Sequence, residues 1–175
     1  MKVQRMFLIV AVLCTAIAAA AGRPASEQPD ASAAFATLKT LVGEWEGTVE
    51  AEGGKAHSSF ELIGNGSALV QRDTYAGPGH ATMLTVYHMD GDRLLMTHFC
   101  EAGNQPRLEL RRFDPAAGEL EFTFLNATNL PSMNVGHIHH VKHRLVDHDH
   151  LLSEWQFYEN GKVKEASKKE LARVR

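Results

Sequence analysis

The chain of 175 residues is 44% hydrophobic and 22% charged, which is enough apolar content for one globular domain with a single core. Its formal net charge is −3 and it contains no basic run, so nucleic acid is not an expected partner. With only two cysteines, Cys14 and Cys100, the chain is not a small scaffold held together by disulfides.

The first 21 residues have the pattern of a secretory signal peptide. Two basic residues among the first five precede an uncharged run, residues 6–21, that ends in three alanines. This run is short for a membrane span, and no later segment reaches the roughly 18 apolar residues that a span needs. We therefore expect an exported protein, periplasmic or secreted, with no membrane span once the signal is cleaved.

Cleavage after residue 21 changes the charge and the cysteine count of the expected mature protein. The basic residues fall to 16 against 21 acidic ones, a formal net charge of −5, and Cys100 is the only thiol left. Residues 22–32 are polar and contain prolines, which is typical of a disordered leader. The folded domain is therefore predicted to span residues 33–175 and to be held by its core rather than by a disulfide.

A short helix is predicted at the start of the domain. Asp30 or Ser32 can serve as its N-cap, and Gly43 stands where a helix often ends in a left-handed residue. Trp45 follows directly, at the start of an extended segment. We expect the helix to plug one end of the domain and Trp45 to be buried. The helical spacing comes from four apolar residues: Phe35, Leu38, Leu41 and Val42.

Ten segments with strand composition follow, separated by glycine-rich or polar turns. Asp90-Gly91 and Asn160-Gly161 are strong hairpin signals, and no helical segment interrupts the series. Ten twisted strands normally curl and close, which also removes the unpaired edges. The sequence therefore predicts an all-β fold, an antiparallel up-and-down closed barrel. The segments are residues 44–52, 56–63, 67–75, 81–89, 93–100, 107–113, 119–125, 135–146, 150–158 and a last strand ending at 174.

The histidines are concentrated in one part of the chain. Nine of the ten lie between residues 80 and 150, most densely in residues 136–143. On a strand, His137, His139 and Val141 share one face. A three-residue turn at residues 147–149 would set Val141 opposite Trp155 and His139 opposite Phe157. This register places the two histidines on the inward, aromatic side of the barrel.

Two functions are open for these histidines. Imidazoles two residues apart on a strand can hold one metal ion with a third ligand, here His98, with Cys100 or Glu109 in reserve. Otherwise they are polar lining residues or lie on a solvated face. On the first reading His98, His137 and His139 form a metal site, and on the second His98, His137, His139 and Trp155 line a ligand pocket.

The loop of residues 103–107 is the other unusual stretch. Asn104, Gln105 and Arg107 offer two amides and a guanidinium at a barrel rim, where they can orient a polar group of a ligand. Alternatively, Arg107 pairs with a nearby glutamate and the amides only satisfy the turn. No Gly-x-Ser-x-Gly motif or phosphate-binding loop is present, and His98 with Cys100 does not make a recognisable catalytic dyad. A binding protein is therefore favoured over an enzyme.

Three stretches resemble one known family. Residues 41–47 (LVGEWEG) resemble the helix-to-strand start of calycin-type, lipocalin-like barrels, which include nitrobindin-like and DUF1579-type domains. Residues 97–107 (THFCEAGNQPR) and 155–162 (WQFYENGK) are similar to segments of exported bacterial members of unsettled function. The resemblance implies a ten-stranded barrel over almost the whole mature domain. It also implies a bound ligand of fatty, pigment or haem type, without assigning one.

We therefore expect an exported, small-molecule-binding barrel, monomeric or weakly dimeric, with a partly apolar ligand inside. The alternatives are a metal-dependent enzyme with a divalent metal on His137 and His139, or a haem-binding protein using barrel histidines.

Overall fold

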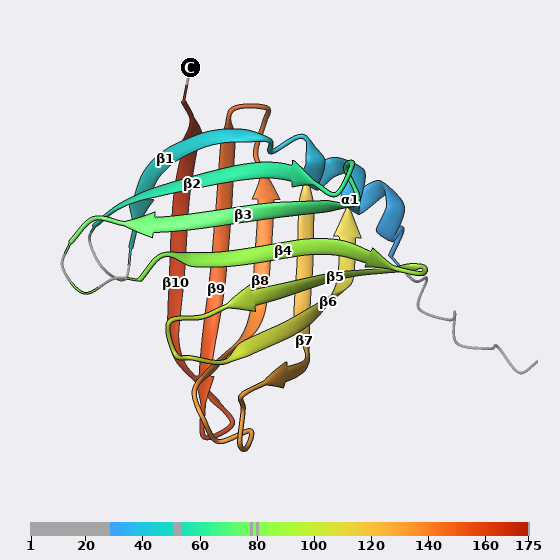
Figure 1. The fold of residues 1–175 in the computed structure, drawn as a ribbon. Coiled ribbons are helices and arrows are strands. Elements are labelled where there is room, and N and C mark those ends of the chain that lie inside the picture. The colour runs from blue at the N-terminus through green and yellow to red at the C-terminus, as the bar shows by residue number, and fades with distance from the viewer. Residues whose placement is uncertain (1–28, 51–53, 78, 80, 175) are drawn as a thin grey trace, which may run out of the picture.

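The computed structural model describes residues 29–50, 54–77, 79 and 81–174, and within them ten antiparallel strands form a closed barrel preceded by one helix (Figure 1). Each strand pairs with the next along the chain, and β10 pairs with β1 to close the barrel. The predicted fold class is therefore confirmed. The predicted signal peptide lies outside the described residues. The strands are β1 (Gly43–Val49), β2 (Gly54–Ile63), β3 (Ala68–Tyr75), β4 (Met83–Asp90), β5 (Arg93–Phe99), β6 (Gln105–Asp114), β7 (Glu119–Thr128), β8 (His137–Leu145), β9 (His150–Glu159) and β10 (Lys162–Arg173).

The helix α1 (Ala31–Lys39) begins two residues before the predicted start of the domain. The carboxylate of Asp30 caps it by accepting a hydrogen bond from the backbone N–H of Ala33 at 2.9 Å, as one of the two predicted caps. The helix ends at Thr40 in the right-handed region, so the prediction that Gly43 terminates it is wrong. Gly43 instead begins β1, with a positive φ of 129°.

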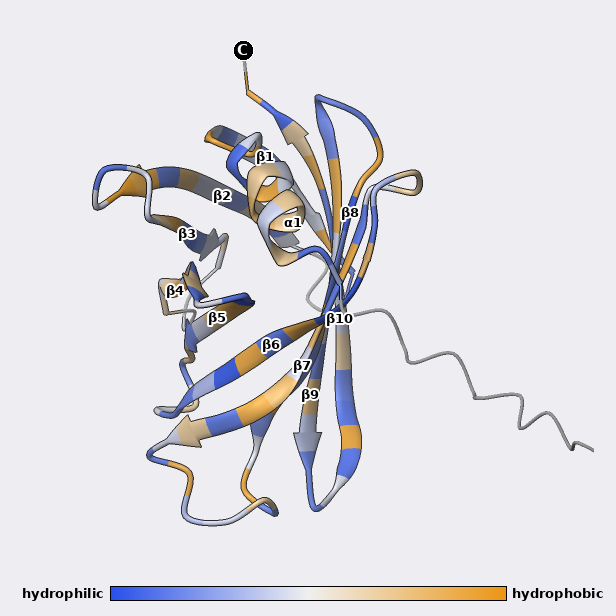
Figure 2. Cartoon of the chain, turned by 90° about the vertical axis from the view of Figure 1, so that its right-hand side faces the viewer, coloured by the Kyte–Doolittle hydropathy of each residue, from blue (hydrophilic) through white to orange (hydrophobic). Residues whose placement is uncertain are grey.

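The apolar face of α1 closes one end of the barrel (Figures 1 and 2). Ala34 and Leu38 are fully buried, and Phe35 is 5% exposed. The helix packs against β4, β5 and β6, so its burial joins the start of the chain to the middle of the sheet. The opposite end of the barrel is left without a helix among the described residues.

Trp45 links α1 to the first strand, as predicted, and is only 1% exposed. Its indole Nε1 donates a hydrogen bond to the backbone oxygen of Leu41 at 2.8 Å, and its ring meets Phe60 edge to face. The guanidinium of Arg173 lies 4.3 Å from the ring centroid. Gly47 follows where β1 crosses β10 closely, since a Cβ there would lie 1.8 Å from the backbone oxygen of Glu170.

Replacing Trp45 by Phe is expected to lower the free energy of unfolding by about 1–3 kcal/mol, because the Leu41 oxygen loses its donor inside the core. Urea denaturation at pH 7 measures the change. A matched replacement at the half-buried Phe157, Phe157→Leu, is expected to cost less. A Trp45→Phe protein as stable as the unchanged one would contradict the assigned hydrogen bond.

The register of β8 and β9 corrects one prediction. Val141 lies opposite Trp155, as predicted. The expected pairing of His139 with Phe157 is wrong, because a β-bulge between Ile138 and His140 leaves His139 without a partner and sets Ile138 opposite Phe157. One extra residue reverses which face the preceding side chains occupy. Ile138, not His139, therefore points into the barrel.

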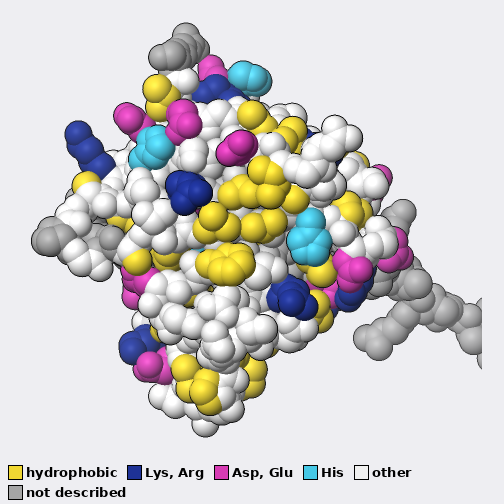
Figure 3. Space-filling view, viewed as in Figure 1, with side chains coloured by type: hydrophobic (Ala, Val, Ile, Leu, Met, Phe, Trp, Pro, Cys, Tyr) yellow, Lys and Arg dark blue, Asp and Glu magenta, His cyan; other side chains and the backbone are white. Residues whose placement is uncertain are grey.

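The outer face of β3, β4 and β5 carries an apolar patch, which Figure 3 shows as hydrophobic side chains gathered on the face presented in Figure 1. We define this outer patch by two cross-strand pairs, Val70 with Val86 and Leu84 with Phe99. Phe99 is 47% exposed. The inward neighbours on the same strands, among them the fully buried Leu69 and Tyr87, belong to the core.

Candidate functional site

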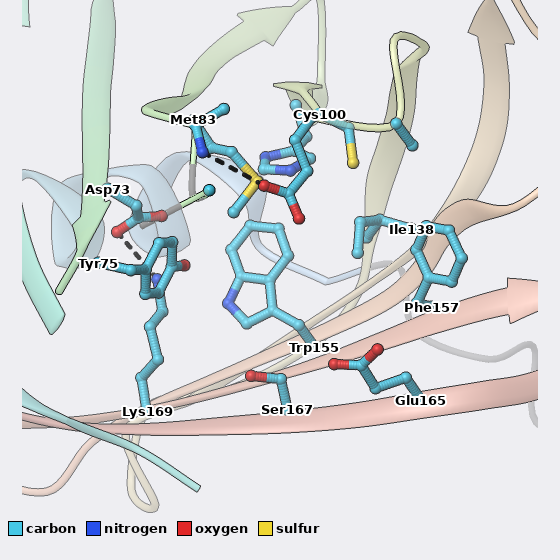
Figure 4. Close-up of a pocket in the computed structure, with 15 residues that line it drawn as sticks. Asp73, Tyr75, Met83, Cys100, Ile138, Trp155, Phe157, Glu165, Ser167 and Lys169 are labelled. Carbon is cyan, nitrogen blue, oxygen red and sulfur yellow. Dashed lines mark hydrogen bonds and ion pairs between the residues drawn. The ribbon is translucent and has the colours of Figure 1, made fainter. Parts of the chain in front are cut away.

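A cavity of about 540 Å³ lies inside the barrel, away from the end that α1 covers. Its walls come from β3, β4, β5, β8, β9 and β10, and its mouth from the β3–β4 connection and the β5–β6 turn. One wall is apolar and consists of Met83, Ile138, Trp155 and Phe157 (Figure 4). Trp155 is 7% exposed, and its ring centroid lies 4.9 Å from that of His98.

The deep wall of the cavity carries a buried ion pair (Figure 4). Nζ of Lys169 lies 2.9 Å from Oδ1 of Asp73, and the two residues are 1% and 2% exposed. Asp73 is the one acidic partner of this ammonium, and no second acceptor bonds to Nζ among the described residues. The ring centroids of Trp155 and Tyr75 lie 5.4 and 5.7 Å from Nζ, which adds cation–π attraction.

Asp73, in contrast, is saturated with donors. Its Oδ1 accepts from Ser58 Oγ at 2.5 Å, and Nε2 of Gln71 lies 3.0 and 2.9 Å from its two oxygens. Burial by itself would raise the pKa of Asp73, but the charge of Lys169 and these hydrogen bonds outweigh burial and hold the pKa below its ordinary value of 3.8. The carboxylate is therefore ionised at neutral pH.

An ionised Asp73 fixes the direction of a hydrogen-bond chain behind the cavity wall. The amide of Gln71 must donate to the carboxylate, so its Oε1 accepts from Tyr87 O–H at 2.7 Å. Because the only proton of Tyr87 is used there, its oxygen accepts from Nε2–H of His143 at 2.8 Å.

The hydrogen-bond chain continues from His143 to Trp155, the tryptophan of the cavity, and its direction follows in the same way. With its proton on Nε2, His143 accepts at Nδ1 from the hydroxyl of Ser153 at 3.0 Å. Ser153 in turn accepts from Nε1–H of Trp155 at 2.7 Å. Every proton in this relay points toward Asp73, and the chain is complete only while His143 is neutral. Burial lowers the pKa of His143 to about 3, which agrees with that requirement.

His98 completes the polar part of the cavity wall. Its Nδ1 lies 2.9 Å from Thr85 Oγ1, and the residue is 2% exposed. Burial lowers the pKa of His98 to about 4, so the ring is neutral at pH 7.

The mouth of the cavity carries two carboxylates and a thiol. The carboxylate of Glu101 accepts a hydrogen bond from the backbone N–H of Ala81 at 3.4 Å, and Glu165 is exposed on β10. Burial raises the pKa of the neighbouring Cys100 thiol, so the thiol is poorly ionised at neutral pH.

Of the residues predicted from the sequence, His98 and Trp155 line this cavity. His137 and His139 do not belong to its lining, because the bulge in β8 turns them to the other face. His137 is 1% exposed, and its Nε2 lies 3.1 Å from Nδ1 of His139. The His139 ring stacks between Phe124 and Tyr158, with centroids 5.2 and 4.3 Å away.

The predicted rim residues also lie outside the lining. Asn104 is 1% exposed and donates to the backbone oxygen of Gly136 at 2.7 Å, which ties the β5–β6 turn to the start of β8. Gln105 accepts at Oε1 from Thr128 at 2.7 Å, and Arg107 is exposed on β6. Both amides thus tie the turn to its neighbours, although Oδ1 of Asn104 is buried with no hydrogen-bond partner among the described residues.

Among the described residues, no group of three or more His, Cys, Asp and Glu side chains is placed to hold a metal ion. The set His98, His137 and His139 does not form such a group, and neither Cys100 nor Glu109 completes one. The carboxylate of Glu109 pairs with Arg111 at 3.0 Å instead.

Sequence reasoning missed the two buried charged residues of the cavity, Asp73 and Lys169. Each sits on a strand at an inward position, in alternation with core residues: Asp73 follows Leu69 and Gln71, and Lys169 precedes Leu171. A charged residue at a core position of an alternating strand is the signal that could have identified them.

No protein-family model and no curated protein matches the chain. Two solved structures share its fold. A protein of unknown function of the DUF3598 family from Nostoc punctiforme is 17% identical with a TM-score of 0.54, over 88% of this chain. Rv2717c from M. tuberculosis is 14% identical with a TM-score of 0.54, over 81% of this chain and 98% of its own. The chain spans about half of the Nostoc protein, 53% of its length.

These likenesses agree with a lipocalin-like barrel, the fold that the sequence resemblance implies, and no family match assigns the chain to the DUF1579 or nitrobindin-like group. Within the described residues, α1 is too short to cross a membrane, and no other helix is present.

Proposed function

We propose that this protein binds a small, partly apolar molecule in the barrel cavity. The observation that carries the proposal is the cavity itself, which combines an apolar aromatic wall with a buried ion pair. Its volume of about 540 Å³ lies within the roughly 300–1,000 Å³ that is usual for ligand pockets. Ligand sites commonly consist of such an apolar lining with a few fixed polar groups.

A binding protein is supported better than the two alternatives. A metal-dependent enzyme or a haem protein would need histidines that converge on the ligand, and His137 and His139 lie outside the cavity lining. Among the described lining residues, His98 is the one histidine, and its Nδ1 already contacts Thr85. We also propose that the protein is exported, and that it is a monomer or a weak homodimer.

Filling the cavity is expected to abolish binding of a hydrophobic fluorescent probe. Ser167 lines the cavity from β10, whereas its neighbour Ala166 is exposed on the outer face. The change Ser167→Phe puts a ring into the cavity and is expected to weaken probe binding at least about tenfold, or roughly 1.4 kcal/mol. The matched change Ala166→Phe adds the same ring outside and is expected to leave the affinity unchanged. Fluorescence titration measures both.

Equal affinities in Ser167→Phe and Ala166→Phe would show that the probe binds elsewhere and would overturn the proposal. The double change His137→Ala with His139→Ala is a second control, expected to leave probe binding intact because neither ring reaches the cavity. Metal analysis and a visible spectrum of the same untagged protein separate the ligand-binding function from the metal and haem alternatives.

A further inference from the structure

The charged groups deep in the cavity have free hydrogen-bond donors but no free acceptor. Among its charged groups, Asp73 is already occupied by Ser58, Gln71 and the ammonium of Lys169. Lys169 carries three N–H donors, and its pairing with Asp73 leaves at least two of them without an acceptor among the described residues. A buried donor without an acceptor is costly, so a ligand group that accepts from Nζ gains the most in this cavity. The polar end of the ligand is therefore an acceptor.

The charges around the cavity disfavour an anionic acceptor. Among the described residues that line the cavity, Lys169 is the only lysine or arginine, and Asp73 already neutralises it. Glu101 and Glu165 stand at the mouth and add two carboxylates to that of Asp73. His98 adds no positive charge at neutral pH because burial lowers its pKa to about 4. A carboxylate or phosphate would thus enter past like charges and come to rest beside a buried carboxylate.

We propose that the ligand carries an uncharged acceptor, such as the carbonyl of a ketone, quinone or ester, that bonds to Nζ of Lys169 while its apolar body packs on Trp155 and Phe157. This inference rests on the proposed function and names the chemistry of the ligand. The sticks in Figure 4 show Lys169 and Trp155 facing the same space, so one small planar molecule can meet both. The centroid of the Trp155 ring lies 5.4 Å from Nζ, about the reach of such a molecule.

Three naphthalenes of nearly equal size test this in the unchanged protein. They are 2-acetylnaphthalene, a ketone; 2-isopropylnaphthalene, which has no acceptor; and 2-naphthoate, a carboxylate. Displacement of the bound fluorescent probe gives the affinity of each. The ketone is expected to bind at least about tenfold tighter than the hydrocarbon, the ratio that one hydrogen bond from a charged donor supplies. The naphthoate is expected to bind weakest.

Any other order of the three affinities would contradict one step of the proposal. A naphthoate that binds as tightly as the ketone would overturn the choice of an uncharged acceptor, while cavity binding itself would stand. Equal affinities for ketone and hydrocarbon would show that Lys169 makes no bond to the ligand. Failure of all three compounds and of the probe to bind would overturn the proposed function as well.

Two double variants test which residues cause the differences in affinity. The paired change Asp73→Asn with Lys169→Met removes the donor without leaving a buried charge, and is expected to reduce the affinity of the ketone to that of the hydrocarbon. The paired change Glu101→Gln with Glu165→Gln, at the exposed mouth, is expected to strengthen naphthoate binding by a few fold and to leave the ketone unchanged. Circular dichroism checks that both fold. If the first does not, the order of affinities in the unchanged protein decides.

Discussion

Lowering the pH from 7 to 4 is expected to remove most of the stability of this barrel. His98 and His143 are 2% and 1% exposed, and burial lowers their pKa values from 6.5 to about 4 and about 3. Between pH 6.5 and these values the unfolded chain takes up two protons that the folded barrel does not. The contribution of these two neutral rings to the free energy of unfolding is therefore fully present above pH 6.5 and is lost as the pH falls toward their pKa values in the folded protein.

The size of the effect follows from the two shifts. At 1.36 kcal/mol for each pKa unit, the shift of His98 corresponds to about 3 kcal/mol and that of His143 to about 5 kcal/mol. By pH 4 each ring has lost about 3 kcal/mol, so together they remove roughly 6 kcal/mol, which is comparable with the roughly 5–15 kcal/mol that stabilises a typical domain. A second proton on His143 would also point at the hydroxyl proton of Ser153 and interrupt the relay. Asp73 adds nothing in this window, because its lowered pKa makes it lose stability only below about pH 4.

Urea denaturation at several pH values between 7 and 4.5 measures the prediction. The slope below pH 6 is expected to approach about 2.7 kcal/mol per pH unit, the value for two protons. The changes His98→Gln and His143→Gln are each expected to halve it. The matched control His148→Gln, on the exposed turn between β8 and β9, is expected to leave it unchanged. A slope near zero between pH 6 and 5 would contradict the neutral, buried state of both rings.

The fold could be predicted from the sequence because its signals are local. Strand boundaries such as those at Asp90-Gly91 and Asn160-Gly161 lie at turn residues, and the helix cap at Asp30 and the burial of Trp45 follow from their immediate neighbours. The placement of Gly43 failed by a few residues because Thr40 ends the helix through backbone bonds to Leu38 and Thr37, without a left-handed residue. A helix that ends in this way needs no glycine or other characteristic residue, so its end could not be predicted from the sequence.

The candidate site could be predicted only in part, because its geometry depends on a bulge and on closure. The alternation of β8 places Val141 correctly, but one bulged residue reverses the face of His137 and His139. Asp73 and Lys169 lie 96 positions apart, on strands that are not neighbours in the sheet. Only the closed barrel brings them together across its interior, so neither periodicity nor turn chemistry could identify the pair.

Replacing Lys169 by Met is expected to lower the free energy of unfolding by about 3–5 kcal/mol, because it leaves the carboxylate of Asp73 buried without its counter-charge. Asp73→Asn is expected to cost a similar amount by leaving the ammonium of Lys169 unpaired. Both residues are at most 2% exposed, so solvent cannot screen the charge that remains. A surface pair serves as the matched comparison. Lys168 and Glu170 flank Lys169 on the outer face of β10 with their charged groups 2.8 Å apart, and Lys168→Met is expected to cost far less than either buried change.

The double change Asp73→Asn with Lys169→Met is expected to cost far less than the two single changes added together, since no unpaired charge remains in it. Urea denaturation of the four proteins at pH 7 gives the coupling energy as the difference. Strict additivity would mean that the two charges do not interact in the folded state. That result would contradict the contact of 2.9 Å, and it would remove the neutralisation of Lys169 on which the choice of an uncharged acceptor depends. A strong coupling would instead identify the pair as a fixed part of the cavity wall, held by the fold before any ligand arrives.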